Sequence, residues 1–145
     1  RFVVVKYGVH GPAEDVTPPS FNARTRVHEY GGAAALVREG TVYFTNFADQ
    51  KLYRQAFGGA PQAVGQTAQC HYADAVFDGA RQRLILVRED HRVSDSQPTN
   101  TVAAVAIDGS NEVVLVKRLL LQSAPKSRRP QTGMAHLEPS AHAMG

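Results

Sequence analysis

Short runs of strand-forming residues recur along residues 1–116, and this repetition limits the possible folds more than any other feature. The pattern that begins at Ala33 begins again at Ala73, about 40 residues later. Turn residues such as Asp78-Gly79 separate neighbouring runs, as in antiparallel hairpins. The expected strands are 2–7, 33–37, 41–46, 52–56, 73–77, 83–87, 101–107 and 112–116.

This period predicts an all-β fold: a partial β-propeller of about two four-stranded antiparallel blades, with an irregular C-terminal tail. The period alone leaves a β-sandwich or an open barrel as alternatives. Two blades cannot close a ring, so strand edges and apolar surface should be exposed. Two segments are expected as loops, namely the proline-rich 11–20 and the charged 88–100, in which the run 88–91 should form a solvated face.

The charge is divided unevenly along the chain, although the calculated pI is about 9.3. Residues 117–145 contain five basic residues and one acidic residue, a net charge of +4, whereas residues 1–116 have a net charge of −1. The body of the chain therefore lacks the basic surface that nucleic-acid binding requires, and no nucleic-acid partner is expected.

Several other classes of function are not expected. No stretch of about 18 apolar residues and no export signal is present, so we expect a cytoplasmic protein without a membrane partner. A single cysteine, Cys70, excludes an internal disulfide. The six histidines form no motif of metal-ligand spacing, so neither a metal site nor a cofactor is expected.

Six runs of sequence carry a resemblance to known proteins: 15–18 (DVTP), 21–32 (FNARTRVHEYGG), 42–50 (VYFTNFADQ), 52–55 (LYRQ), 72–74 (YAD) and 88–91 (REDH). They resemble the propellers of bacterial serine peptidases of the prolyl oligopeptidase family, in particular acylaminoacyl peptidases and dipeptidyl-peptidase-like enzymes. The resemblance covers residues 1–116, and its sharpest part is 21–32.

The resemblance implies a propeller that screens access to an α/β-hydrolase domain with a Ser-Asp-His triad, in an enzyme that cleaves short or N-acylated peptides. No serine in this chain lies in a Gly-x-Ser-x-Gly elbow, so we expect the chain alone to be inactive, with peptide substrates met through the missing domain. The alternative is a stand-alone propeller-like module that binds peptides or proteins.

The resemblance ends at residue 116, which divides the chain into a partial propeller, 1–116, and a basic tail, 117–145. The codons of Met134 and Met144 are each followed by a codon that starts with G, for Ala135 and Gly145. A reading frame shifted by one nucleotide therefore reads a tryptophan codon at each place, ten residues apart. With permissible codons elsewhere, the shifted peptide resembles the next propeller segment of the family. We therefore expect a frameshift near Lys117 and an out-of-frame tail.

The candidate substrate-access or domain-interface residues are Arg24, Arg26, His28, Glu29 and Tyr30. In an extended strand Arg24, Arg26 and His28 would share one face, with Val27 and Glu29 on the other. A structural role between blades is the stronger interpretation, and the alternative is that they shape the route to the active site.

Two neighbouring features complete the candidates. Gly31-Gly32 is expected where the backbone approaches another segment closely. Cys70 and His71 are adjacent, so in a strand they would point to opposite faces and could not form a catalytic pair.

Overall fold

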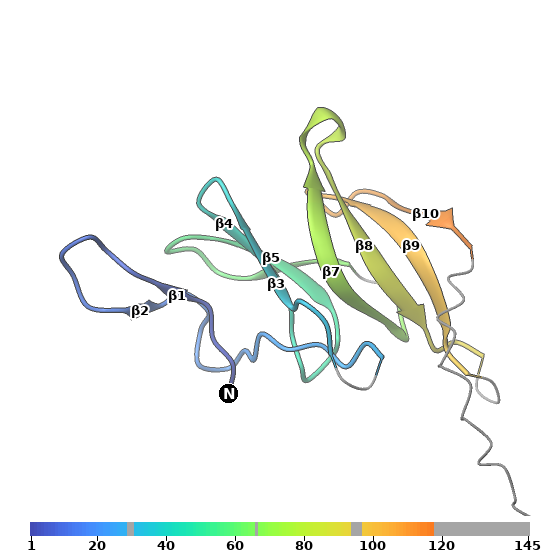
Figure 1. Ribbon diagram of the computed structural model, residues 1–145, viewed down its shortest axis with the longest axis horizontal. Helices are drawn as coiled ribbons and strands as arrows, with labels where there is room; N and C mark the ends of the chain where they lie inside the picture. The colour runs from blue at the N-terminus through green and yellow to red at the C-terminus, as the bar shows by residue number, and fades with distance from the viewer. Residues whose placement is uncertain (29–30, 66, 94–96, 118–145) are drawn as a thin grey trace, which may run out of the picture.

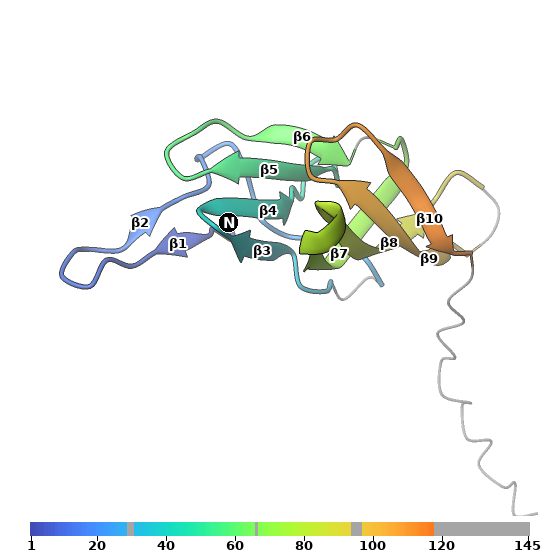
Figure 2. The same ribbon diagram turned by 90° about the horizontal axis from the view of Figure 1, so that it is seen from above.

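Two four-stranded antiparallel sheets lie beside each other and form the body of the protein (Figures 1 and 2). The computed structural model describes residues 1–28, 31–65, 67–93 and 97–117. The first sheet contains β3 (Ala35–Arg38), β4 (Thr41–Thr45), β5 (Leu52–Ala56) and β6 (Gln62–Gly65). The second contains β7 (Cys70–Asp78), β8 (Arg83–Asp90), β9 (Thr99–Ala106) and β10 (Glu112–Val116), with a 3₁₀ turn at Gly79–Arg81.

Within each of these sheets, strands that are consecutive along the chain pair with each other, so both sheets are simple meanders. Tight turns permit this order: Glu39 and Gly40, between β3 and β4, both have positive φ, at 47° and 72°, as a two-residue hairpin turn requires. The sheets do not close on themselves. The fold is therefore the predicted partial propeller, with two four-stranded blades.

The two blades share one hydrophobic core. Contacts join β3 and β4 to β7, and β6 to β9. Side chains from both sheets meet there, and the buried members are Tyr43, Leu52, Val64, Cys70, Tyr72, Leu84, Leu86, Ala103 and Val105. Burial of these apolar surfaces against each other, rather than within one sheet, holds the blades together.

Alternation along β8 divides the second blade into two faces. Leu84 and Leu86 lie in the shared core, so Ile85 and Val87 point to the opposite side, which we call the outer face. The register extends this face across the sheet, because partners in an antiparallel pair share a face. The cross-strand rows of the outer face are Val76–Ile85–Ala104–Val113, Ala73–Val87–Val102 and His71–Glu89–Asn100.

Three expectations about local structure were wrong. The proline-rich segment 11–20 is not a continuous loop, because β2 (Glu14–Asp15) pairs with β1 (Val5–Lys6) in a separate hairpin. Strand β6 was missed, since only Val64 gives it an apolar signal and its pairing with β5 defines it. The run 88–91 is not a solvated loop, because β8 continues to Asp90 and buries Arg88 and Glu89.

Among the described residues no helix is long and apolar enough to cross a membrane. The predicted out-of-frame tail, from residue 118 onward, lies outside the described residues.

Candidate functional site

The segment that contains the candidate residues crosses the end of the first blade, where the turn from β4 to β5 lies. Ala23 forms an isolated antiparallel bridge with Asn46. The Arg24 amide donates to the Thr45 carbonyl at 3.0 Å, and the Arg26 amide donates to Oε1 of the buried Gln50 at 2.8 Å. These bonds fix the backbone and leave the two arginine side chains free to face outward.

Arg24 and Arg26 lie on the same aromatic ring. Their guanidinium carbons are 5.1 and 4.2 Å from the centroid of Phe47, within the range of a cation–π contact. Both arginines are exposed, whereas Thr25 and Val27 between and beside them are buried. The predicted alternation is therefore confirmed for Arg24, Arg26 and Val27, and it produces a small cationic surface over an aromatic ring.

His28 does not continue this surface. The Gly31 amide donates to the Val27 carbonyl at 2.9 Å, which closes a turn and places His28 at a φ of 57°. The expectation of an extended strand through His28 was wrong for this reason. The His28 amide instead donates to Oε2 of Glu89 on the second blade at 3.2 Å, and Glu29 and Tyr30 lie outside the described residues.

The glycine pair allows the close approach that the sequence indicates. A Cβ on Gly31, where φ is 80°, would lie 3.1 Å from the Thr25 carbonyl oxygen. A Cβ on Gly32 would lie 2.7 Å from Oδ2 of Asp74. The other carboxylate oxygen of Asp74, Oδ1, accepts a hydrogen bond from the Ala33 amide at 2.7 Å. This contact ties the segment to β7.

A group of three side chains that the sequence did not predict lies at the same end of the second blade. One potential ligand atom each of His71, Glu89 and His91 lies within 4.8 Å of the others. Burial lowers the pKa of His71, and the charges of His91 and Arg26 lower it further. The sequence shows no metal-ligand spacing for these residues, because they come from two strands and become neighbours only through the register of the strands.

The core side of β8 carries an ionic network. Arg88 donates to Glu112 on β10 at 2.9 Å, and the Tyr72 hydroxyl donates to the other carboxylate oxygen at 3.0 Å. Burial, together with Glu112, raises the pKa of Tyr72. Hydrogen bonds from Arg92 hold the pKa of Asp90 at about 2.

Cys70 and His71 are separated as predicted. Cys70 lies in the shared core, where burial raises the pKa of its thiol, and His71 is paired with Glu89 on the outer face. The expectation that the two side chains point to opposite faces is confirmed.

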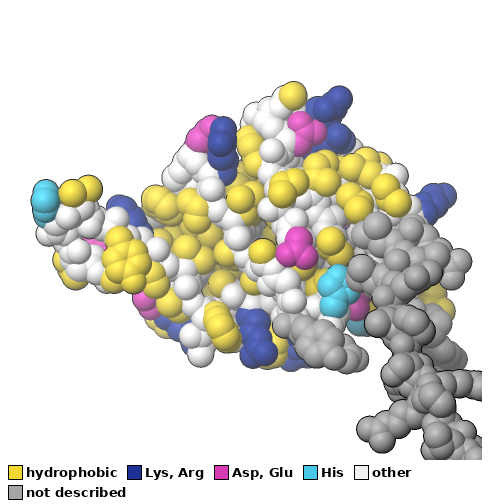
Figure 3. All heavy atoms as spheres, viewed as in Figure 1, with side chains coloured by type: hydrophobic (Ala, Val, Ile, Leu, Met, Phe, Trp, Pro, Cys, Tyr) yellow, Lys and Arg dark blue, Asp and Glu magenta, His cyan; other side chains and the backbone are white. Residues whose placement is uncertain are grey.

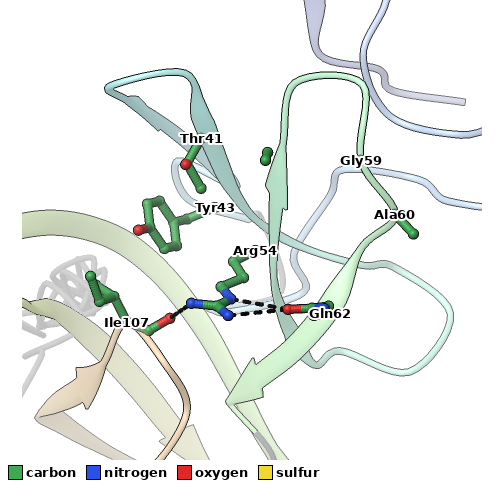
Figure 4. Close-up of a pocket in the computed structure, with 8 residues that line it drawn as sticks. Thr41, Tyr43, Arg54, Gly59, Ala60, Gln62 and Ile107 are labelled. Carbon is green, nitrogen blue, oxygen red and sulfur yellow. Dashed lines mark hydrogen bonds between the residues drawn. The ribbon is translucent and has the colours of Figure 1, made fainter.

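Two open hollows lie near the blades. One, of about 420 Å³, is lined by Arg24 and by apolar residues that include Phe2 and Ala34. The other, of about 370 Å³, contains Arg54, which donates to the Ile107 carbonyl at 3.0 Å and to Gln62 (Figure 4). Among the residues that the structure describes, no histidine or carboxylate lines either hollow.

Comparison with solved structures identifies the propeller. A crystal structure of a puromycin hydrolase mutant complexed with PGG matches 79% of this chain with a TM-score of 0.70 and 27% identity. A puromycin-hydrolyzing peptidase of Mycobacterium tuberculosis matches 74% of it with a TM-score of 0.65 and 28% identity. These are peptidases of the prolyl oligopeptidase family. The predicted resemblance to this peptidase propeller is confirmed.

The match covers only a small part of each peptidase. This chain spans about 20% of the length of each matched peptidase, within the propeller region. No protein-family profile matches the sequence, and no curated protein matches it by sequence comparison. The likeness is therefore to the propeller region of these peptidases and not to their whole length.

Proposed function

We propose that this chain is the substrate-gating part of a serine peptidase propeller, and that short or N-acylated peptides pass it on the way to a separate hydrolase domain. The structural match to puromycin-hydrolysing peptidases carries the proposal. The chain itself supplies no nucleophile, because none of its serines lies in a Gly-x-Ser-x-Gly elbow. A cytoplasmic location belongs to the same proposal.

The surface formed by Arg24, Arg26 and Phe47 would contact the substrate. A guanidinium group can bind a carboxylate through two parallel hydrogen bonds, so the free C-terminus of a short peptide is a suitable ligand. Phe47 holds both cations at one place, which favours recognition of a single carboxylate.

A chimaeric enzyme tests this role. Residues 1–117 replace the corresponding propeller segment of the M. tuberculosis peptidase, and hydrolysis is measured with puromycin and with a series of peptides. We expect activity to be retained. The double variant Arg24→Ala/Arg26→Ala should raise KM for peptides with a free C-terminal carboxylate more than for their C-terminal amides.

The matched control is Arg81→Ala, which removes an exposed arginine from the turn between β7 and β8. An equal rise in KM for acids and for amides in the double variant would assign the two arginines a structural role only. Tight peptide binding by the isolated chain, with an inactive chimaera, would support the stand-alone binding module instead.

Sequencing of the gene across codon 117 and downstream provides an independent test. We expect a one-base correction to restore the tryptophan-containing reading and a Gly-x-Ser-x-Gly elbow to follow. An intact frame without such an elbow would contradict the peptidase proposal and favour the binding module.

A further inference from the structure

The register of β7 and β8 brings three metal-binding side chains together on the outer face of the second blade. His71 and Glu89 are direct cross-strand partners. Glu89 and His91 are two residues apart, and the His91 amide donates to the Gln69 carbonyl at 2.9 Å, which extends the ladder past the end of β8. Alternation therefore places His91 on the same face as Glu89.

The three side chains have unused bonding capacity. Nδ1 of His71 and Nε2 of His91 are buried and have no hydrogen-bond partner within the described part of the chain. The side chain of Glu89 is only 6% exposed, and its Oε2 lies 3.6 Å from Nε2 of His91, beyond a normal hydrogen bond. Buried polar atoms without partners are rare, because each one costs free energy. Two such imidazole nitrogens beside a buried carboxylate therefore favour the presence of a ligand.

We propose that His71, Glu89 and His91 bind one divalent transition-metal ion, with Zn²⁺ as the best fit. Two imidazole nitrogens and one carboxylate oxygen are ligands that Zn²⁺ favours, and three protein ligands leave a further position for water. The proposal does not depend on the proposed peptidase function.

The geometry needs only a small adjustment to accept the ion. Metal–ligand bonds of about 2.0 to 2.2 Å in a tetrahedral site separate the ligand atoms by roughly 3.3 Å. The separation of 3.6 Å between His91 and Glu89 is already close to this value. His71 and His91 are both partly exposed, so their rings can turn the remaining distance without a change in the sheet.

A bound ion would connect three segments. His71 comes from β7 and Glu89 from β8, while Glu89 also accepts a hydrogen bond from the His28 amide. Fixing the Glu89 carboxylate would therefore fix the turn at Val27 and His28 that follows the candidate arginines. The site would stabilise this end of the propeller.

Titration of the full 145-residue chain with ZnCl₂, followed by calorimetry and thermal unfolding, tests the proposal. We expect one equivalent to bind and to raise the midpoint of unfolding. His71→Ala, His91→Ala and Glu89→Gln should each weaken binding by more than about tenfold, since loss of a residue that merely supports a ligand already costs that much. His10→Ala, in an exposed loop, and the tail variant His136→Ala/His142→Ala should bind like the wild type.

Two results would overturn the proposal: no saturable binding of Zn²⁺, or binding that is unchanged in the His71 and His91 variants. In the first case the cluster binds no zinc, and in the second the ion binds elsewhere. X-ray absorption of the wild-type zinc form needs no variant to fold. Two imidazoles and one carboxylate oxygen on zinc would support the site, and fewer than two imidazoles would exclude it.

Discussion

At the scale of single residues, the buried contacts of Arg88 explain how a peptidase propeller can carry charge inside a blade. The Arg88 side chain is 9% exposed and the Glu112 side chain is 13% exposed, so both have lost most of their contact with water. Removal of one partner from such a pair leaves an uncompensated buried charge, which costs far more than the loss of a surface pair.

Glu112→Ala should therefore lower the free energy of unfolding by roughly 3 kcal/mol. Tyr72 would lose its acceptor in the same variant. Urea denaturation followed by circular dichroism measures the change. Arg81→Ala, which removes an exposed ion pair with Asp78, should change the value by less than about 1 kcal/mol, and a similar loss in both variants would contradict a special role for Glu112.

Asp90 should make stability depend on acid pH. Its pKa in the folded protein, about 2, lies below the ordinary value of 3.8 because Arg92 donates to it. The stabilisation is thus complete above about pH 4 and is lost as the pH falls towards 2. Unfolding measured between about pH 5 and pH 2 should show a smaller loss of stability in Asp90→Asn than in the wild type, and parallel curves would disprove this.

Gly32 should not tolerate a side chain. The Cβ of Gly32→Ala would lie 2.7 Å from a carboxylate oxygen of Asp74, whose other oxygen holds the Ala33 amide. We expect a loss of about 1 to 3 kcal/mol in thermal or urea unfolding. Gly11→Ala is the control, because a Cβ there meets no atom within 4 Å, and equal stability of the two variants would refute the contact.

At the scale of elements, β4 and β7 are linked by a polar contact between the two blades. The hydroxyl of the buried Thr45, at the end of β4, donates to the Tyr72 carbonyl on β7 at 2.9 Å. This bond crosses from one sheet to the other inside the core, where an unpaired carbonyl is costly. The orientation of the blades therefore depends on a polar contact as well as on apolar packing.

Thr45→Val keeps the shape of the side chain and removes the donor. We expect a loss of about 1 to 2 kcal/mol, with increased hydrogen exchange of the amides in β7. Thr41→Val, at the other end of β4, should have a smaller effect on both measurements. Faster exchange confined to β4 would show that the bond does not link the blades.

At the scale of the whole molecule, the outer face of the second blade is only partly covered in the described chain. Its central row contains Val76 and Val113, which are 59% and 45% exposed. Apolar side chains also cover much of the surface in Figure 3, with charged groups mainly near its margins. A third blade would cover the outer face in a complete propeller, because each blade buries its faces against its neighbours.

The isolated chain should consequently self-associate. Sedimentation velocity over a range of concentrations should show dimers or larger species, and Val113→Lys should shift the distribution towards the monomer. Val9→Lys, on the hairpin of β1 and β2, should leave it unchanged, since Val9 is exposed but lies outside the outer face. A wild-type chain that remains monomeric at all concentrations would contradict the prediction.

The sequence alone determined the blades and their order. Strands β5 and β10 begin and end where the pattern predicts, because alternation and turn residues are local signals. The exposed pair Arg24 and Arg26 also follows from alternation. The family resemblance could be identified because it depends on runs of consecutive residues.

Only the tertiary structure decided which distant residues meet. Three features join segments that are 20 or more residues apart or depend on strand register: the bond from the His28 amide to Glu89, the pairing of Arg88 with Glu112, and the cluster of His71, Glu89 and His91. Alternation fixes the face of a strand on which a side chain lies, but not the partner that lies opposite it. That partner is set by the register and by the packing of one blade on the next, which minimise exposed apolar surface over the whole molecule.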